Sequence, residues 1–143
     1  MTGTNLGAGL GNVAMLFRLR NASNDGCRLD GYPQIQLVSE TGAFLPTTET
    51  HAVDGDYSFP AIPAGPVALG PGDTASFELG YGDNPSGAAI SLPYDVACPT
   101  AQRVRIILPG THQFGTAVVP LAPCEGRINV SPIFPGPDRV EFP

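Results

Sequence analysis

The sequence predicts an all-β chain, folded as a single antiparallel, immunoglobulin-like β-sandwich of about 7–8 strands. Apolar and polar residues alternate in several short segments, as they do in strands with one buried face. The chain of 143 residues contains 18 glycines and 16 prolines, yet 42% of it is hydrophobic, which is typical of a folded, turn-rich domain. No window of about ten residues keeps helical spacing without a Gly or a Pro.

The first clear strand covers residues 13–20. Its apolar positions are Val13, Met15, Phe17 and Leu19. Arg18 and Arg20 fall on the opposite face, so we expect a half-buried strand. Thr-Gly at 41–42 then predicts a hairpin between the strands around it, 33–38 and 43–45.

The remaining predicted strands follow the same alternation. They cover 74–79, 103–108, 114–121 and 127–133. The positions expected to face the core in these strands and in 33–38 are Ile35, Leu37, Ala75, Phe77, Leu79, Val104, Ile106 and Leu108. We predict a long loop over 47–70 with one short strand at its end. The domain division is 1–12 as an N-terminal segment that could contain a truncated first strand, 13–134 as the sandwich, and 135–143 as a tail.

Charge and hydropathy exclude several classes of partner. The net charge is −6, and all seven basic residues are arginines with no basic stripe, so nucleic-acid binding is disfavoured. The same charge disfavours a polybasic attachment to anionic lipid. No apolar run reaches the roughly 18 residues of a membrane span. The segment Met1–Leu6 is not a signal peptide, so either the protein is cytoplasmic or an export signal lies upstream.

The three cysteines permit a geometric prediction. If 103–108 and 114–121 pair as a hairpin with Leu108 opposite Phe114, the same register extended outward brings Cys98 opposite Cys124. A disulfide there would close a loop of about 26 residues and stabilise the fold by roughly 3 kcal/mol. Cys27 is left over, and the alternative is that all three cysteines are buried thiols. The absence of a CxxC pair disfavours zinc and thioredoxin-like chemistry.

The run Cys27-Arg-Leu-Asp-Gly-Tyr-Pro33 after a strand and Asn21-x-Ser resembles the hallmark of the bacterial domain of unknown function 4232 family. Leu69–Ala75, Cys98 and Cys124 resemble later parts of the family pattern, so the resemblance spans roughly residues 13–130. It implies exported or lipid-anchored proteins, frequent in actinobacteria, with an immunoglobulin-like sandwich and no established activity. Family members commonly carry a further cysteine near the N-terminus, and this chain has none before Cys27.

One loop gathers the candidate binding residues. They are His51, Asp54, Asp56, Tyr57 and Phe59. An EF-hand needs a longer acidic series closed by Glu, so an ordinary solvated loop is favoured over a metal site. Tyr57 and Phe59 could anchor a partner if they are exposed.

Other constellations are weaker. His112 is expected in a turn, and no spacing supports a Cys–His nucleophile or a glycosidase carboxylate pair. Copper would require soft ligands, and Met15 belongs to a predicted core face. Four arginines, Arg18, Arg20, Arg103 and Arg105, would form an outward cluster if their strands are neighbours. We therefore predict no catalytic residue, no cofactor and no metal.

The resulting functional expectation is a non-enzymatic, extracytoplasmic binding or structural module of the cell envelope. Its partner would be an unknown protein or a cell-wall component, bound through a sheet face or through the loop at 47–66. The alternative is a hydrolase whose active site is assembled from loops.

Overall fold

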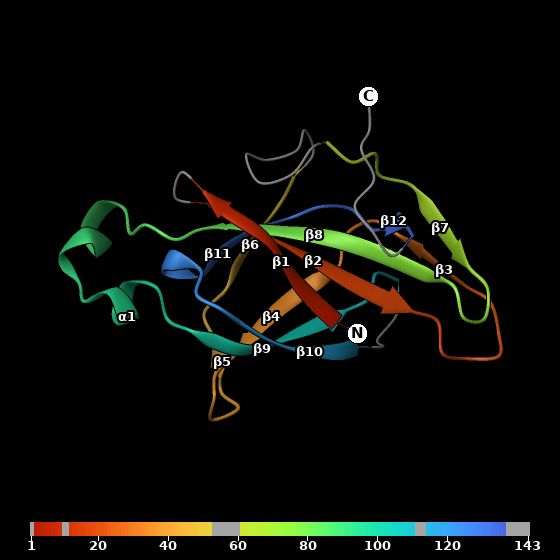
Figure 1. The fold of residues 1–143 in the computed structure, drawn as a ribbon, viewed down its shortest axis with the longest axis horizontal. Helices are drawn as coiled ribbons and strands as arrows, with labels where there is room; N and C mark the ends of the chain where they lie inside the picture. The colour runs from red at the N-terminus through yellow and green to blue at the C-terminus, as the bar shows by residue number, and fades with distance from the viewer. Residues whose placement is uncertain (1, 10–11, 53–60, 111–113, 137–143) are drawn as a thin grey trace.

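The computed structural model describes residues 2–9, 12–52, 61–110 and 114–136. Most of these residues lie in strands that form several sheets, and the prediction of a mostly β chain is confirmed. The described part contains twelve strands, more than the 7–8 expected, because several are only two to four residues long. The two termini of the β-rich part, β1 and β12, both belong to the largest sheet (Figure 1).

The largest sheet has the order β1-β2-β8-β11-β6, and β12 pairs with β8. Its members are β1 (Thr2–Gly9), β2 (Asn12–Arg20), β6 (Thr48–His51), β8 (Thr74–Gly82), β11 (Arg127–Val130) and β12 (Phe134–Pro135). The pairing of β11 with β6 is parallel, which corrects the expectation of purely antiparallel sheets. A parallel pair requires a long connection, and the chain between these two strands supplies one. Strand β6 lies within the segment expected to be a loop.

A second sheet has four strands in the order β10-β9-β4-β5. They are β4 (Gln34–Val38), β5 (Phe44–Leu45), β9 (Ala101–Ile107) and β10 (Phe114–Leu121). The predicted hairpin around 41–42 is present as β4 and β5. A third sheet pairs β3 (Cys27–Asp30) with β7 (Pro66–Leu69), the short strand expected at the end of the long loop.

The two larger sheets and the β3–β7 pair share one apolar core. All the residues predicted to face inward are buried there except Leu108, which is only partly buried. Phe17 of β2 and Phe77 of β8 stack at the centre, with their ring centroids 5.1 Å apart. The period-two pattern therefore identified the inner face correctly.

The outer face of the largest sheet differs from the expectation that β2 is half-buried. Leu16 is only 2% exposed and Glu78 of β8 is fully buried. Leu16 packs in a second apolar cluster with Ala52, Ile62 and Phe134. Ala52 and Ile62, which lie between β6 and β7, thus cover part of this face together with Phe134 of β12.

The predicted disulfide forms just beyond the hairpin of β9 and β10, but most of that hairpin has a different register from the one assumed. Phe114 lies opposite Ile107 rather than Leu108. The register shifts between Val118 and Leu121, so that Leu121 lies opposite Ala101. Such a shift is a β-bulge, and Pro120, which cannot donate to the ladder, lies within it. Beyond the shift the chain follows the register assumed from the sequence, and Cys98 is bonded to Cys124.

Candidate functional site

Large apolar side chains are exposed in two regions of the described chain. Phe44, Phe114 and Val118 lie on the four-stranded sheet, and Ile90, Leu92, Tyr94 and Val96 lie on the connection from β8 to β9. Scattered apolar residues on a surface are ordinary, but gathered ones indicate an interaction site. These two regions are therefore the candidate sites.

The first region is the outer surface of the four-stranded sheet. Directly paired residues point to the same side of a sheet, so the pairing defines three outward rows. The rows are Phe114, Ile107 and Gln34; Thr116, Arg105 and Gln36; and Val118, Arg103, Val38 and Phe44. We call this surface the aromatic face. Its rows contain two arginines and no carboxylate.

Arg105 lies between two phenylalanines on the aromatic face. Its guanidinium carbon is 3.8 Å from the ring centroid of Phe114 and 5.9 Å from that of Phe44. The negative face of an aromatic ring attracts a cation at these distances, so the rings hold the side chain in place. Neither Arg105 nor Arg103 has a carboxylate partner among the described residues. The charge of these two arginines is therefore not neutralised by a described carboxylate.

The middle row also has unused hydrogen-bonding capacity. Nε of Arg105 and Oε1 of Gln36 are buried and have no hydrogen-bond partner in the described part of the chain. The two residues are directly opposite each other on β9 and β4. Most buried polar atoms have a hydrogen-bond partner, so two unpaired buried atoms in one row are unusual.

The four arginines that would cluster on neighbouring strands do not lie on neighbouring strands. Arg18 and Arg20 lie on β2 of the largest sheet, whereas Arg103 and Arg105 lie on β9, whose neighbours are β10 and β4. The condition for an outward cluster of all four arginines, adjacent strands, is therefore not met. Only the β9 pair belongs to the aromatic face.

The second region, residues 83–98, is called the tip. It contains a 3-10 turn, η1 (Gly87–Ser91), and one helical turn, α1 (Tyr94–Ala97). Figure 1 shows both at one end of the molecule, opposite the β3–β7 pair. The exposed fractions of its four large apolar side chains range from 47% at Leu92 to 69% at Ile90.

Two contacts fasten the tip to the rest of the fold, and a third lies within the tip itself. The Cys98–Cys124 disulfide packs in a small buried cluster with Ala97. The backbone N–H and the hydroxyl of Ser86 both donate to the Glu125 carboxylate, at 3.1 Å. The Tyr94 hydroxyl donates to the carbonyl oxygen of Asp83, at 2.9 Å. The tip is therefore fixed in place, although most of it has no regular secondary structure.

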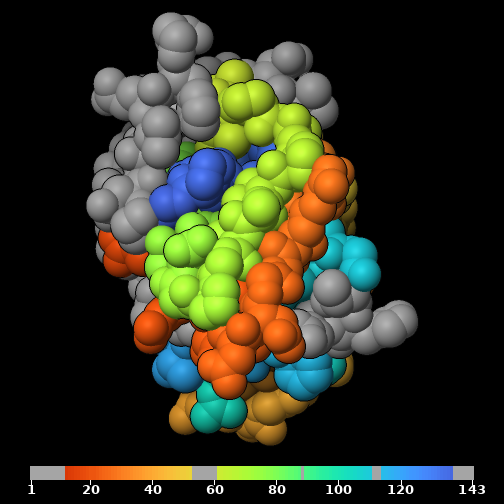
Figure 2. All heavy atoms as spheres, turned by 90° about the vertical axis from the view of Figure 1, so that its right-hand side faces the viewer, coloured from red at the N-terminus to blue at the C-terminus, as the bar shows by residue number. Residues whose placement is uncertain are grey.

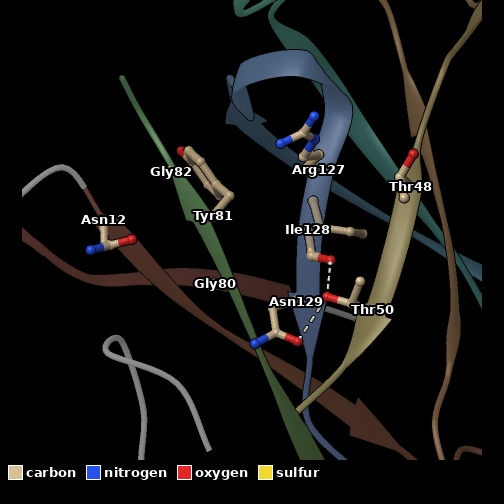
Figure 3. A pocket seen from close by; sticks show the side chains of 9 residues that line it. All are labelled: Asn12, Thr48, Thr50, Gly80, Tyr81, Gly82, Arg127, Ile128 and Asn129. Carbon is tan, nitrogen blue, oxygen red and sulfur yellow. Dashed lines mark hydrogen bonds between the residues drawn. The ribbon is translucent and has the colours of Figure 1, made fainter. Parts of the chain in front are cut away.

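A small hollow opens where β8 and β11 diverge (Figure 3). These strands pair only at Gly80–Asn129 and Leu79–Val130. The hollow has a volume of about 220 Å³, and Figure 3 shows its polar rim. The rim side chains are Asn12, Thr48, Thr50, Tyr81, Arg127 and Asn129. The Thr50 hydroxyl is 3.2 Å from the Ile128 carbonyl oxygen and 3.0 Å from Oδ1 of Asn129, so part of this rim is bonded to itself.

Tyr81 lines this hollow, and the pKa of its phenol is raised. Burial raises its pKa above the ordinary value of 10.0, and the neighbouring charge of Asp83 adds to the rise. A backbone hydrogen bond at Ala122 acts in the opposite direction. The phenol is neutral at physiological pH, so it offers hydrogen bonding rather than acid–base chemistry.

A larger hollow of about 420 Å³ lies at the β3–β7 end, which faces the viewer in Figure 2. Leu19, Leu29 and Leu69 contribute to its lining, and Asn21 organises its loop. The Asn21 amide nitrogen donates to the carbonyl oxygens of Leu69, at 3.0 Å, and Asp25, at 2.8 Å. Cys27 lines this hollow as an exposed, free thiol. It is the cysteine that the sequence prediction left without a disulfide partner.

The predicted binding loop is only partly described. His51 ends β6 and stacks on Tyr32, with ring centroids 3.9 Å apart. Its Nε2 is 2.9 Å from Oε2 of Glu49, whose Oε1 accepts the Ile35 N–H at 2.7 Å. His51 is therefore engaged in local packing. The other candidates of this loop, Asp54, Asp56, Tyr57 and Phe59, and also His112, lie outside the described residues.

Neither the aromatic face nor the tip was predicted from the sequence. Phe114 and Val118 share a parity that places them on the outer face of the predicted strand 114–121, which was a usable signal.

Among the described residues, no group of three or more His, Cys, Asp and Glu could hold a metal ion. A search of the same residues found no helix long and apolar enough to cross a membrane.

The chain matches a known protein family. The sequence profile of the family described as "Domain of unknown function (DUF4232)" matches residues 2–133, which confirms the resemblance found in the sequence. No curated protein and no solved structure matches the chain.

Proposed function

Because this chain belongs to the DUF4232 family, whose description names no activity, we propose a function from its surface. The protein is a non-enzymatic binding module of the cell envelope, built as an immunoglobulin-like sandwich. It docks its aromatic face against a protein partner whose surface is apolar and acidic.

The observation that carries this proposal is the chemistry of the aromatic face. Phe44 is 59% exposed, Phe114 55% and Val118 81%, and Arg105 is held between the two rings. Exposed aromatic residues and arginine are enriched at the centres of protein interfaces. Two arginines with no carboxylate partner in the described part of the chain are conspicuous at a net charge of −6, and they favour an acidic partner.

The cysteine chemistry bears on the compartment. A disulfide that fastens a surface element persists in an oxidising environment and is rare in reducing ones. This supports an extracytoplasmic location, with the protein secreted or anchored by lipid at the cell surface. The hydrolase alternative has no comparable support among the described residues, where Tyr32 and Glu49 engage His51.

A photo-crosslinking experiment tests the docking surface. Phe114 is replaced by benzoylphenylalanine in the chain produced in its native host, and intact cells are irradiated. We expect a discrete covalent adduct, because position 114 would contact the partner. Adding Arg105→Glu should reduce the adduct about tenfold or more, since a charge reversed at an interface opposes the acidic partner.

The matched control places the same crosslinker at position 28. Arg28 is exposed on β3, away from the four-stranded sheet, and should give no discrete adduct. An adduct at 28 but not at 114, or one at 114 that Arg105→Glu leaves unchanged, would contradict the proposal.

A further inference from the structure

The tip and the aromatic face of this chain have complementary surfaces. Together they account for all the large apolar side chains that are exposed in the described residues. The face adds positive charge to its apolar groups, and the tip adds negative charge to its own. We propose that the tip of one copy of this chain docks on the aromatic face of a second copy. This inference rests on the proposed function and names its partner.

The charge of the tip is uniformly acidic. Residues 83–98 contain Asp83 and Asp95 and no Lys or Arg. Asp95 is exposed beside Tyr94 and Val96, and no described cation pairs with it. Its carboxylate has the sign and the apolar surroundings that Arg105 and its two phenylalanines would accept.

The tip is also prepared for docking before any contact forms. The disulfide at Cys98 and the hydrogen bonds of Ser86 and Tyr94 hold it in one arrangement. Glu125 accepts the hydrogen bonds of Ser86 and has a positive φ of 59°, as no other non-glycine residue does in the described part of the chain. A backbone held in that region indicates that the surrounding structure fixes it. An ordered apolar element loses less conformational entropy on binding than a mobile loop does.

The same charge argues against a lipid surface as the partner of the tip. Anionic headgroups attract Lys and Arg beside inserted apolar residues, and residues 83–98 supply neither. A protein surface that offers arginine beside aromatic rings fits better, and the described part of this chain itself contains one.

The contact would join two different surfaces, so it is heterologous. Each copy keeps a free tip or a free face after one contact forms. Association therefore continues into a ring, if the rotation between copies closes, or into an open chain. The assembly would be concentration-dependent and weakened by salt, because charges contribute to it.

Sedimentation velocity over a concentration series tests the inference. The wild-type chain should associate progressively, and Arg105→Glu and Asp95→Arg should each weaken association about tenfold or more. The double variant with both substitutions restores opposite charges and should recover most of the association. Arg28→Glu serves as the matched control for charge alone and should associate like the wild type.

Three results would overturn the inference. They are a wild-type chain that stays monomeric at every concentration, a double variant no better than its parents, and a tip that binds phosphatidylcholine vesicles through Leu92 while the chain remains monomeric. A monomeric chain that still gives an Arg105-dependent adduct at position 114 would leave the proposed function standing. Loss of that adduct as well would remove both.

Discussion

Gly126 shows how one residue can fix a local fold. Its φ is +66°, a region that residues with a Cβ rarely adopt, and an added Cβ would overlap the carbonyl oxygen of Pro46. It follows Cys124 and Glu125, which hold the tip. Glycine is therefore required here for both conformation and space.

Gly126→Ala should destabilise the protein severely, by about 3 kcal/mol or more, because backbone strain and steric overlap act together. Gly110→Ala is the matched control, since Gly110 has a φ of +74° but open space around its missing side chain. Strain alone should cost about 1 kcal/mol there. Urea unfolding measures both, and equal losses would show that the contact with Pro46 is unimportant.

Tyr81 predicts a pH dependence. Its folded-state pKa is raised above 10.0, so above about pH 10 the unfolded chain loses this proton before the folded chain does. The stability linked to Tyr81 is therefore complete below pH 10 and declines as the pH rises through the folded-state pKa. Tyr81→Phe should flatten the decline in unfolding free energy above pH 10, as measured by urea unfolding over a pH series. A decline that Tyr81→Phe leaves unchanged would contradict the assignment.

At the scale of elements, the tip depends on a single covalent link. Cys98 and Cys124 are 26 residues apart, and the bond between them lies at the base of the connection from β8 to β9. Irregular segments have few backbone hydrogen bonds of their own, so side-chain and covalent links decide their order. The disulfide therefore stabilises the fold and prepares the tip at once.

Replacing both Cys98 and Cys124 with Ser should lower the unfolding free energy by about 3 kcal/mol, because the unfolded chain regains the entropy of an open loop. Amide exchange should accelerate over 83–98 more than in β2 and β8. Cys27→Ser is the control and should change neither quantity, since Cys27 is exposed and free. Unchanged exchange in the tip would show that its hydrogen bonds suffice without the disulfide.

Element positions were largely predictable from sequence, whereas pairing details were not. Alternation identified the inner faces of β2, β4, β8 and β9 because a buried face requires every second residue to be apolar. The bulge near Pro120 could not be read this way, since it displaces the register without changing the composition. The burial of Leu16 depends on Ala52 and Ile62, which are distant in sequence.

At the scale of the whole molecule, the candidate site is a product of strand order. Phe44 and Phe114 are far apart in sequence and meet Arg105 only because β5, β4, β9 and β10 are adjacent. The disulfide could be predicted because it follows from one local hairpin. The parity of Phe114 and Val118 indicated an outer face, but the complete aromatic face also requires the pairing of two hairpins, which no local pattern encodes.

Hydroxyl-radical footprinting of the protein on intact host cells, compared with the dilute purified chain, tests the central claim most directly. We predict that Phe44 and Phe114 are oxidised in the purified chain and much less oxidised on cells, where a partner covers the aromatic face. Phe17, which is fully buried, should remain unoxidised in both. Equal oxidation of Phe44 and Phe114 on cells and in solution would contradict the account, because the face would then be uncovered where the protein works.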